Sequence, residues 1–328
     1  MDMRKSIRLS IGLLLFSTGF LTSCQNEAYQ SCEGGVWNTL YHITYKGPKE
    51  LADSVTKELE TIGKSLNVFD TTSLVAKLNR QQGILADEHL YAVYEGSRKI
   101  NKISRGRFDP TLSPLITAWG FGIGHAATAD TTANDSILHF VGIDKTHLEG
   151  NEIVKEDIRT QFNFSAIAKG YGCDAIGRMF RRNGVEDYLV EIGGEISLSG
   201  VSPQGGLWKI SIDAPTEDEN PEHASAIVIA LTDKGIATSG NYRNYRIENG
   251  AKLAHTISAV TGRPYISEIL SATVIAGNCM EADALATACM ASLPDEALLM
   301  LEEYGADGML ILPDTLLMTP GFRSLESR

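Results

Sequence analysis

The chain has 328 residues and carries 41 acidic against 29 basic side chains, a formal net charge of −12. This acidic balance argues against nucleic acid, and against an anionic membrane surface, as the main partner. The length suits one large domain or two small ones with an ample core, and the five cysteines show neither a CxxC pair nor a zinc-site spacing.

The first 23 residues have the pattern of a bacterial lipoprotein signal peptide. Basic residues precede the apolar run 11–16, which is too short to span a bilayer. Residues 21–24, Leu-Thr-Ser-Cys, match the lipobox, so we expect residues 1–23 to be removed and Cys24 to carry the lipid. Residues 24–36 are then expected to form a polar tether, and the mature protein to be an exported, membrane-anchored lipoprotein that faces the periplasm.

Hydrophobic periodicity predicts helices early in the mature chain and many strands later. The expected helices cover residues 49–65, 74–80, 88–104, 136–141, 168–182, 294–304 and a segment that starts at Asn278. The expected strands cover residues 40–45, 152–155, 158–164, 186–192, 195–200, 207–213, 225–231, 235–238, 244–248, 254–259, 270–276 and 308–312. This succession indicates an α+β fold with mixed or antiparallel sheets and packed helices. Because no Pro/Ser-rich linker divides the body, we expect a single domain over residues 37–328.

The helix expected from Asn278 is the most informative segment of the chain. Asn278 and Glu281 form a capping-box-like start. Asp283 and Thr287 are four residues apart and so share one helix face, among Ala, Leu, Met and Cys neighbours. Two hard oxygens on one face suit Mg²⁺, which takes few protein ligands. The alternative is that Asp283 stabilises the helix N-terminus and Thr287 bonds back to its own helix.

A second segment, residues 162–174, has features of an anion site. A strand ends, small residues form a turn, and a helix begins with Lys169 in its first turn. Free N–H groups, the helix dipole and the ammonium favour a phosphate there. The segment matches neither the P-loop nor GxGxxG, so a tight turn that carries a surface lysine explains it equally well.

Three further segments are dense in special residues and lack regular periodicity. Between Asp109 and Gly122, the aromatic side chains could flank a planar ring or fill the core. The segment around Ser239 could line a sugar or adenine site, or form a hairpin corner. His255 starts an expected strand just upstream of the Asp283 helix and is either a general base or a structural residue.

Taken together and in this order, six motifs resemble those of the ApbE family of FAD:protein FMN transferases. They are Phe-Asp-Pro…Trp-Gly-Phe-Gly, Ser-Ala-Ile-Ala-Lys-Gly-Tyr, Glu-Ile-Gly-Gly-Glu, Thr-Ser-Gly-Asn-Tyr, His-Thr-Ile-Ser…Thr-Gly-Arg-Pro and Ala-Asp-Ala-Leu-Ala-Thr. The resemblance covers nearly the whole mature chain and implies an ApbE-like, T-fold-related domain. The family transfers FMN from FAD to a threonine or serine hydroxyl of a target protein and releases AMP. The implied targets are subunits of the sodium-pumping NADH:quinone reductase or of Rnf-type complexes.

The same resemblance implies roles for individual residues. Mg²⁺ would be held by the side chains of Asp283 and Thr287 and by the backbone carbonyl of Ala166, which also makes Asp283 a catalytic residue. His255 resembles the residue that deprotonates the acceptor hydroxyl. The positions expected to contact FAD are Leu66, Asn67, Val68, Asp109, Ala118, Trp119, Gly120, Lys169, Ser239 and Ile257.

The chain departs from the family pattern at two places. Asn163 stands where many members have Asp, and Trp37-Asn38-Thr39 replaces a frequent Met/Phe-Gly-Thr. Either change could alter the affinity for FAD or the balance between transfer and hydrolysis. Two other functions therefore stay open: a periplasmic FAD pyrophosphatase that releases FMN and AMP, and a flavin-binding lipoprotein without catalytic activity.

Overall fold

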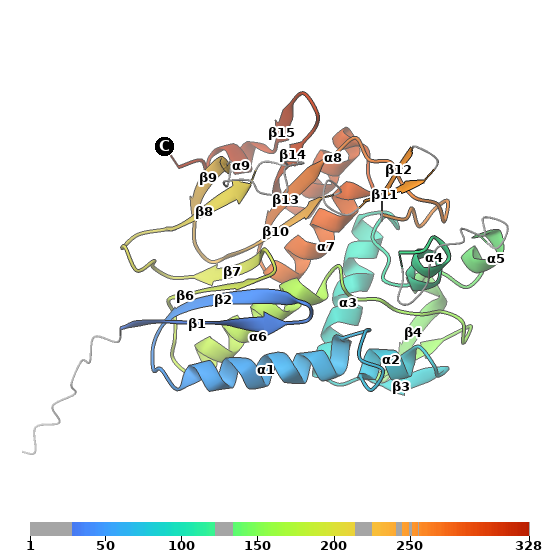
Figure 1. Cartoon of the computed structure of the whole chain (residues 1–328), viewed down its shortest axis with the longest axis horizontal. Helices are drawn as coiled ribbons and strands as arrows, with labels where there is room; N and C mark the ends of the chain where they lie inside the picture. Colours follow the sequence, from blue (N-terminus) through green and yellow to red (C-terminus); the bar gives the residue numbers. More distant parts are fainter. Residues whose placement is uncertain are drawn as a thin grey trace, which may run out of the picture.

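The computed structural model describes residues 28–121, 134–213, 225–240, 245–248, 251–254 and 256–327. An eight-stranded sheet in the order β1-β2-β6-β7-β10-β13-β14-β15 lies at its centre (Figure 1). All the strand pairs of this sheet are antiparallel. Its strands are β1 (Tyr29–Val36), β2 (Thr39–Lys46), β6 (Tyr188–Ile192), β7 (Glu195–Ser199), β10 (Lys234–Gly240), β13 (Ser271–Ala276), β14 (Asp307–Ile311) and β15 (Leu316–Met318).

Helices and smaller strand groups surround this sheet, and the expected α+β class is confirmed. The helices are α1 (Leu51–Leu66), α2 (Leu74–Leu78), α3 (Glu88–Ile103), α4 (Ser113–Ala118), α5 (Asn134–Leu138), α6 (Ala168–Arg182), α7 (Cys279–Met290), α8 (Pro294–Tyr304) and α9 (Pro320–Arg323), with a 3₁₀ turn at Ile143–Lys145. The smaller groups are the sheet of β3 (Gly83–Leu85), β5 (Glu152–Lys155) and β4 (Thr146–Glu149), the hairpin of β8 (Trp208–Asp213) and β9 (Ser225–Leu231), and the hairpin of β11 (Tyr245–Glu248) and β12 (Ala251–Ala254). Within the described residues, no helix has both the length and the apolar character needed to cross a membrane.

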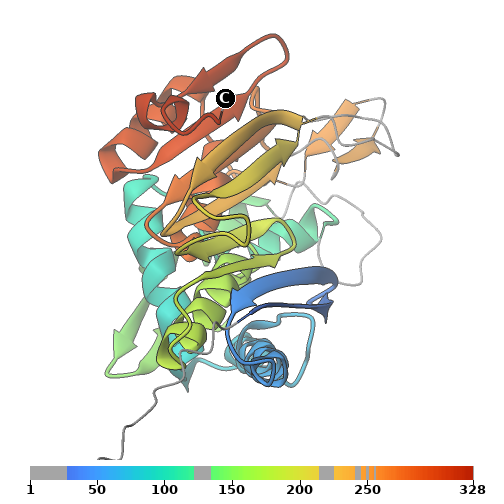
Figure 2. The ribbon, with the colours of Figure 1, turned by 90° about the vertical axis from the view of Figure 1, so that its left-hand side faces the viewer.

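The main sheet is covered on both faces at its centre and on one face near β1. Helices α6 and α7 lie on one side, and the β8–β9 hairpin lies on the other (Figure 2). In β13, Val274 packs into the cluster on the helix side and Ile275 into the cluster that contains Trp208, so every residue of the strand is buried. In β2, buried Ile43 alternates with exposed His42, because only one face of that strand is covered.

Helix α7 is buried on nearly all sides, and its first turn is capped from two directions. The Asn278 side chain accepts a hydrogen bond from the Glu281 N–H at 2.9 Å, which confirms the predicted cap. The Glu281 carboxylate, however, bonds to the Asn278 side-chain amide and not to its backbone. From α6, the buried Asp174 carboxylate accepts from the N–H groups of Cys279 and Met280 at 3.0 and 2.8 Å. These bonds satisfy N–H groups that a helix start leaves free.

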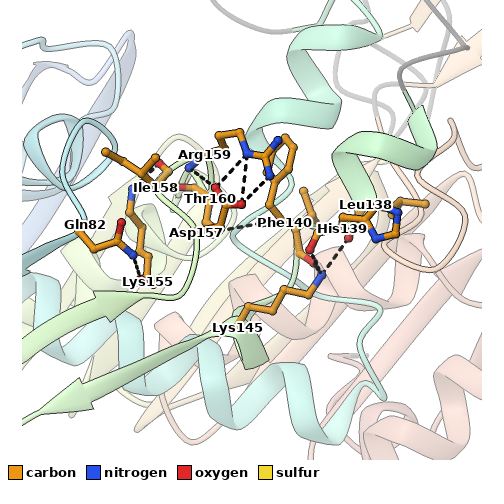
Figure 3. Close-up of polar contacts among 11 residues, drawn as sticks. Gln82, Leu138, His139, Phe140, Lys145, Lys155, Asp157, Ile158, Arg159 and Thr160 are labelled. Atoms are coloured by element: carbon orange, nitrogen blue, oxygen red, sulfur yellow. Dashed lines mark hydrogen bonds and ion pairs between the residues drawn. The ribbon is translucent and has the colours of Figure 1, made fainter.

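Two lysines hold the segment that leads from α5 towards α6 (Figure 3). The Lys145 ammonium donates to the carbonyls of Leu138, His139 and Val141 at 2.7–2.9 Å. The buried Lys155 ammonium donates to the carbonyls of Leu78, Ile158 and Thr160 at 2.9–3.0 Å. In the irregular chain after β5, the carbonyls of Ile158 and Thr160 are therefore paired, as buried backbone groups require.

Three expectations about secondary structure were wrong in part. Residues 29–36 belong to the sheet and not to the tether, because β1 pairs with β2 along its full length. Residues 158–164 form no extended strand, because Lys155 binds carbonyls that a neighbouring strand would otherwise bind. The strand expected over 254–259 is not seen in the described residues 256–259: β12 ends at Ala254, and Ile257 makes only an isolated bridge to Pro264.

Candidate functional site

A cleft with a volume of about 810 Å³ brings together distant parts of the chain. The predicted site residues that line it are Leu66, Asn67, Val68, Asp109, Ala166, Lys169, Ser239, Ile257, Asp283 and Thr287. Ala118, Trp119 and Gly120 are not among its lining residues. Cys24 and His255 lie outside the described residues, so the structure does not place them.

Helices α6 and α7, which supply Lys169 and Asp283 to the cleft, are in close contact at Gly170. A Cβ at Gly170 would lie 2.3 Å from the carbonyl oxygen of Cys279 and 2.9 Å from the Cβ of Asp283, so only glycine permits this approach. The Gly170 N–H donates to the Oδ2 atom of Asp283 at 3.0 Å. Asp283 is 2% exposed, and burial raises the pKa of its carboxyl, whereas Lys169 and the Gly170 N–H oppose the rise.

The hydrogen bond from Gly170 also frees the carbonyl of Ala166. In a regular helical turn, the N–H of residue 170 bonds to the carbonyl of residue 166. Here it bonds to Asp283, and within the described residues no N–H group bonds to the Ala166 carbonyl. The Asn163 side chain accepts from the Ser165 N–H at 2.9 Å and so shapes the turn before Ala166.

The hydroxyl of Thr287 lies one helical turn beyond Asp283 on the same wall of the cleft. It lies 3.4 Å from the hydroxyl of Ser239 on β10. This contact brings Thr287 on α7 and Ser239 on the main sheet, both predicted site residues, next to each other. Carboxylate, hydroxyl and free carbonyl oxygens are the donors that Mg²⁺ prefers, so these residues fit that ion. The set needs only one acidic side chain, and no cluster of three or more His, Cys, Asp or Glu residues suited to a metal occurs in the described part of the chain.

Lys169 supplies the positive charge in this wall. Its ammonium donates to the Oε1 atom of Glu195 on β7. Burial alone would lower the pKa of Lys169, but the negative charges of Asp283 and Glu195 raise it. Burial, with a smaller contribution from Asp283, raises the pKa of Glu195, whereas Lys169 opposes the rise. The lysine therefore stays protonated beside the two acidic side chains.

The predicted flavin-side residues fall into two groups. Leu66, Val68 and Ile257 are apolar residues that line the cleft. Leu66 is the last residue of α1, Val68 comes shortly after it, and Ile257 comes after β12 in the chain. Trp119 lies next to the cleft, where its indole N–H donates to the carbonyl of Gly262 at 2.7 Å. This bond holds the turn that follows Ile257, and Trp119 packs against the cluster that contains Ile257.

Asp109 lines the cleft, but its carboxylate is occupied within the protein. Oδ1 accepts from the backbone N–H and the hydroxyl of Thr111 at 2.8 and 2.6 Å. Oδ2 accepts from the Ile143 N–H at 3.0 Å and from the Asn101 amide at 3.3 Å. Asp109 therefore organises the surrounding loops, and burial raises the pKa of its carboxyl.

Two contributors to the cleft were missed by the sequence reasoning. Trp37 has φ 47°, which is uncommon for a bulky residue, and its indole occupies the space beside Gly63 and Gly172. Its departure from the family pattern marked it, but its packing partners could not be read from the chain. Glu195 lies inside the Glu-Ile-Gly-Gly-Glu motif, and only the fold shows its pairing with Lys169.

The model of the ApbE family matches residues 37–310. This chain belongs to the ApbE family. It is 33% identical over 291 residues to a FAD:protein FMN transferase of Vibrio cholerae, covering 84% of this chain and 85% of the relative. It is 31% identical over 310 residues to a FAD:protein FMN transferase of Haemophilus influenzae, covering 89% of each chain.

Solved structures agree with this assignment. The structure of the flavin transferase ApbE from Vibrio cholerae matches with a TM-score of 0.82 and 26% identity, over 91% of this chain and 99% of that chain. The apo form of the Pseudomonas stutzeri flavinyl transferase ApbE matches with a TM-score of 0.81 and 27% identity, over 91% and 96%. The expectation that the chain is an enzyme of the transferase class is confirmed by these relatives.

Proposed function

We propose that this chain is a Mg²⁺-dependent FAD:protein FMN transferase. In the reaction, a threonine or serine hydroxyl of a target protein attacks the phosphorus of the FMN half, the bond to the AMP half breaks, and AMP leaves. The observation that carries this proposal is the Gly170–Asp283 hydrogen bond, because it joins α6 to α7 and releases the Ala166 carbonyl on the same wall. The names of the relatives support the substrate and the reaction.

The residues of the cleft have distinct tasks in this proposal. Asp283, Thr287 and the Ala166 carbonyl would hold Mg²⁺, which, when bound, neutralises charge on the diphosphate. The Lys169 ammonium attracts the same phosphates. The side chains of Leu66 and Ile257 provide apolar contact for the flavin ring and keep water from it.

The remaining steps of the proposal rest on the sequence. His255 accepts the proton of the acceptor hydroxyl, which is a weak nucleophile at its own pKa. Cys24 carries the lipid, so that the enzyme works on the periplasmic side of a membrane. Its targets are subunits of the sodium-pumping NADH:quinone reductase or of Rnf-type complexes.

The test is a transfer assay read by intact mass. The protein is incubated with FAD, MgCl₂ and the flavin-accepting domain of a sodium-pumping reductase subunit, and the acceptor should gain one FMN, less a water, on a threonine. Asp283→Asn should abolish the gain, whereas Glu303→Gln, at an exposed ion pair on α8, should retain it. Free FMN produced at full rate without an acceptor would instead assign a pyrophosphatase, and FAD bound but left intact would assign a flavin-binding protein.

A further inference from the structure

Glu195 is a buried carboxylate that the proposed chemistry does not use. It is 4% exposed and lines the cleft at the start of β7. Its Oε1 atom accepts from Lys169, but Oε2 is buried and has no hydrogen-bond partner within the described residues. A buried carboxylate with only one of its two oxygens hydrogen-bonded lowers the stability of the fold. Proteins typically retain such destabilising groups at functional sites.

The backbone leading to Glu195 is built to place it there. Gly193 and Gly194 connect β6 to β7 with φ angles of 60° and 97°, which a residue with a side chain rarely adopts. A Cβ at Gly193 would lie 2.9 Å from the Thr39 hydroxyl oxygen and 3.4 Å from the Cδ of Lys169. The turn therefore passes close to the lysine side chain and delivers Glu195 to its ammonium.

Lys169 has two carboxylates within its electrostatic reach. It is bonded to Glu195, while Asp283 exerts a strong attraction on it without a hydrogen bond or ion pair between them. In the described part of the chain, the only donor to the Asp283 carboxylate is the Gly170 N–H. If the ammonium moved to Asp283, it would compete directly with a cation for the same oxygens.

We propose that Glu195 is a positioning residue that holds the Lys169 ammonium away from Asp283, so that the Asp283 carboxylate stays free for a divalent cation. This inference rests on the cation site of the proposed function and adds the residue that keeps it open. Glu195 itself contacts neither the cation nor the reacting atoms in this role. Its effect passes through Lys169.

The test combines cation binding with a structure and needs no catalytic turnover. Mn²⁺ binding, followed by electron paramagnetic resonance without FAD, should weaken about tenfold or more in Glu195→Gln, equivalent to about 1.4 kcal/mol. A crystal structure of that variant without divalent ions should place the Lys169 ammonium within ion-pair distance of Asp283. Glu195→Asp, which keeps the charge, should retain most of the affinity, and Glu303→Gln is the matched control for loss of one carboxylate.

The possible results separate the inference from the proposed function. Mn²⁺ binding unchanged by Glu195→Gln, or Lys169 still distant from Asp283 in that variant, would overturn the inference alone. A wild-type protein that binds no Mn²⁺ would overturn the cation site and the inference together. If Glu195→Gln does not fold, equal Mn²⁺ affinity of a folded Glu195→Ser variant and the wild type would also overturn the inference.

Discussion

Replacing Gly170 by alanine tests whether the contact between α6 and α7 sets the geometry of the cleft. The new Cβ would lie 2.3 Å from the Cys279 carbonyl oxygen, a backbone atom that cannot rotate away. Reaching an ordinary contact of about 3.5 Å requires the helices to separate by roughly 1 Å. Such overpacking costs about 3 kcal/mol, whereas alanine gains about 1 kcal/mol over glycine in a helix. We therefore expect the free energy of unfolding to fall by about 2 kcal/mol.

The assay is urea unfolding followed by circular dichroism, together with Mn²⁺ binding to the folded variant. Binding should weaken as well, because separation of the helices lengthens the Gly170–Asp283 hydrogen bond. Gly277→Ala is the matched control, since a Cβ there meets nothing within 4 Å and its backbone is not left-handed. A Gly170→Ala protein as stable as the wild type would refute the reasoning, because helix propensity would then outweigh the contact.

Two further predictions address buried polar groups and the flavin side. Lys155→Met leaves three carbonyls without their donor and should lower the free energy of unfolding by about 3 kcal/mol. The control, Lys57→Met at an exposed position, should lower it by less than about 0.5 kcal/mol. Equal effects in the two variants would show that the hydrogen bonds of Lys155 do not stabilise the fold. Trp119→Phe removes the donor to the Gly262 carbonyl and should lower the free energy of unfolding by about 1 kcal/mol. It should also weaken FAD binding, measured by a flavin-fluorescence titration. Unchanged stability and affinity would show that this hydrogen bond does not support the cleft.

Much of the regular structure could be predicted from local pattern. The observed α6 and α8 have the predicted bounds, because their apolar spacing and end signals agree. The first strand was missed, because in residues 29–36 glycine and polar residues interrupt the hydrophobic alternation, and pairing with β2 stabilises the strand. Residues 158–164, Ile-Arg-Thr-Gln-Phe-Asn-Phe, roughly alternate apolar and polar side chains, which favours a strand, but the Lys155 ammonium binds the carbonyls of Ile158 and Thr160.

The site was predicted less completely than the helices. Spacing on one helix was enough to bring Asp283 and Thr287 to the same wall. The role of Asp109 could not be read this way, because the donors that occupy its carboxylate come partly from the distant Ile143. Glu195 was missed for a similar reason: its partner lies 26 residues away on another element, and no local pattern encodes such a pair.

The hairpin of β1 and β2 determines how the domain resists force applied at its N-terminal end. Trp37, at the tip of β1 and β2, is wedged between Gly63 on α1 and Gly172 on α6. Tension applied to the segment before Tyr29 would run along an edge strand of the sheet and meet resistance at this wedge. Trp37 also lines the cleft, so in a protein anchored at its N-terminus, as we propose, this tension would act beside the proposed FAD site.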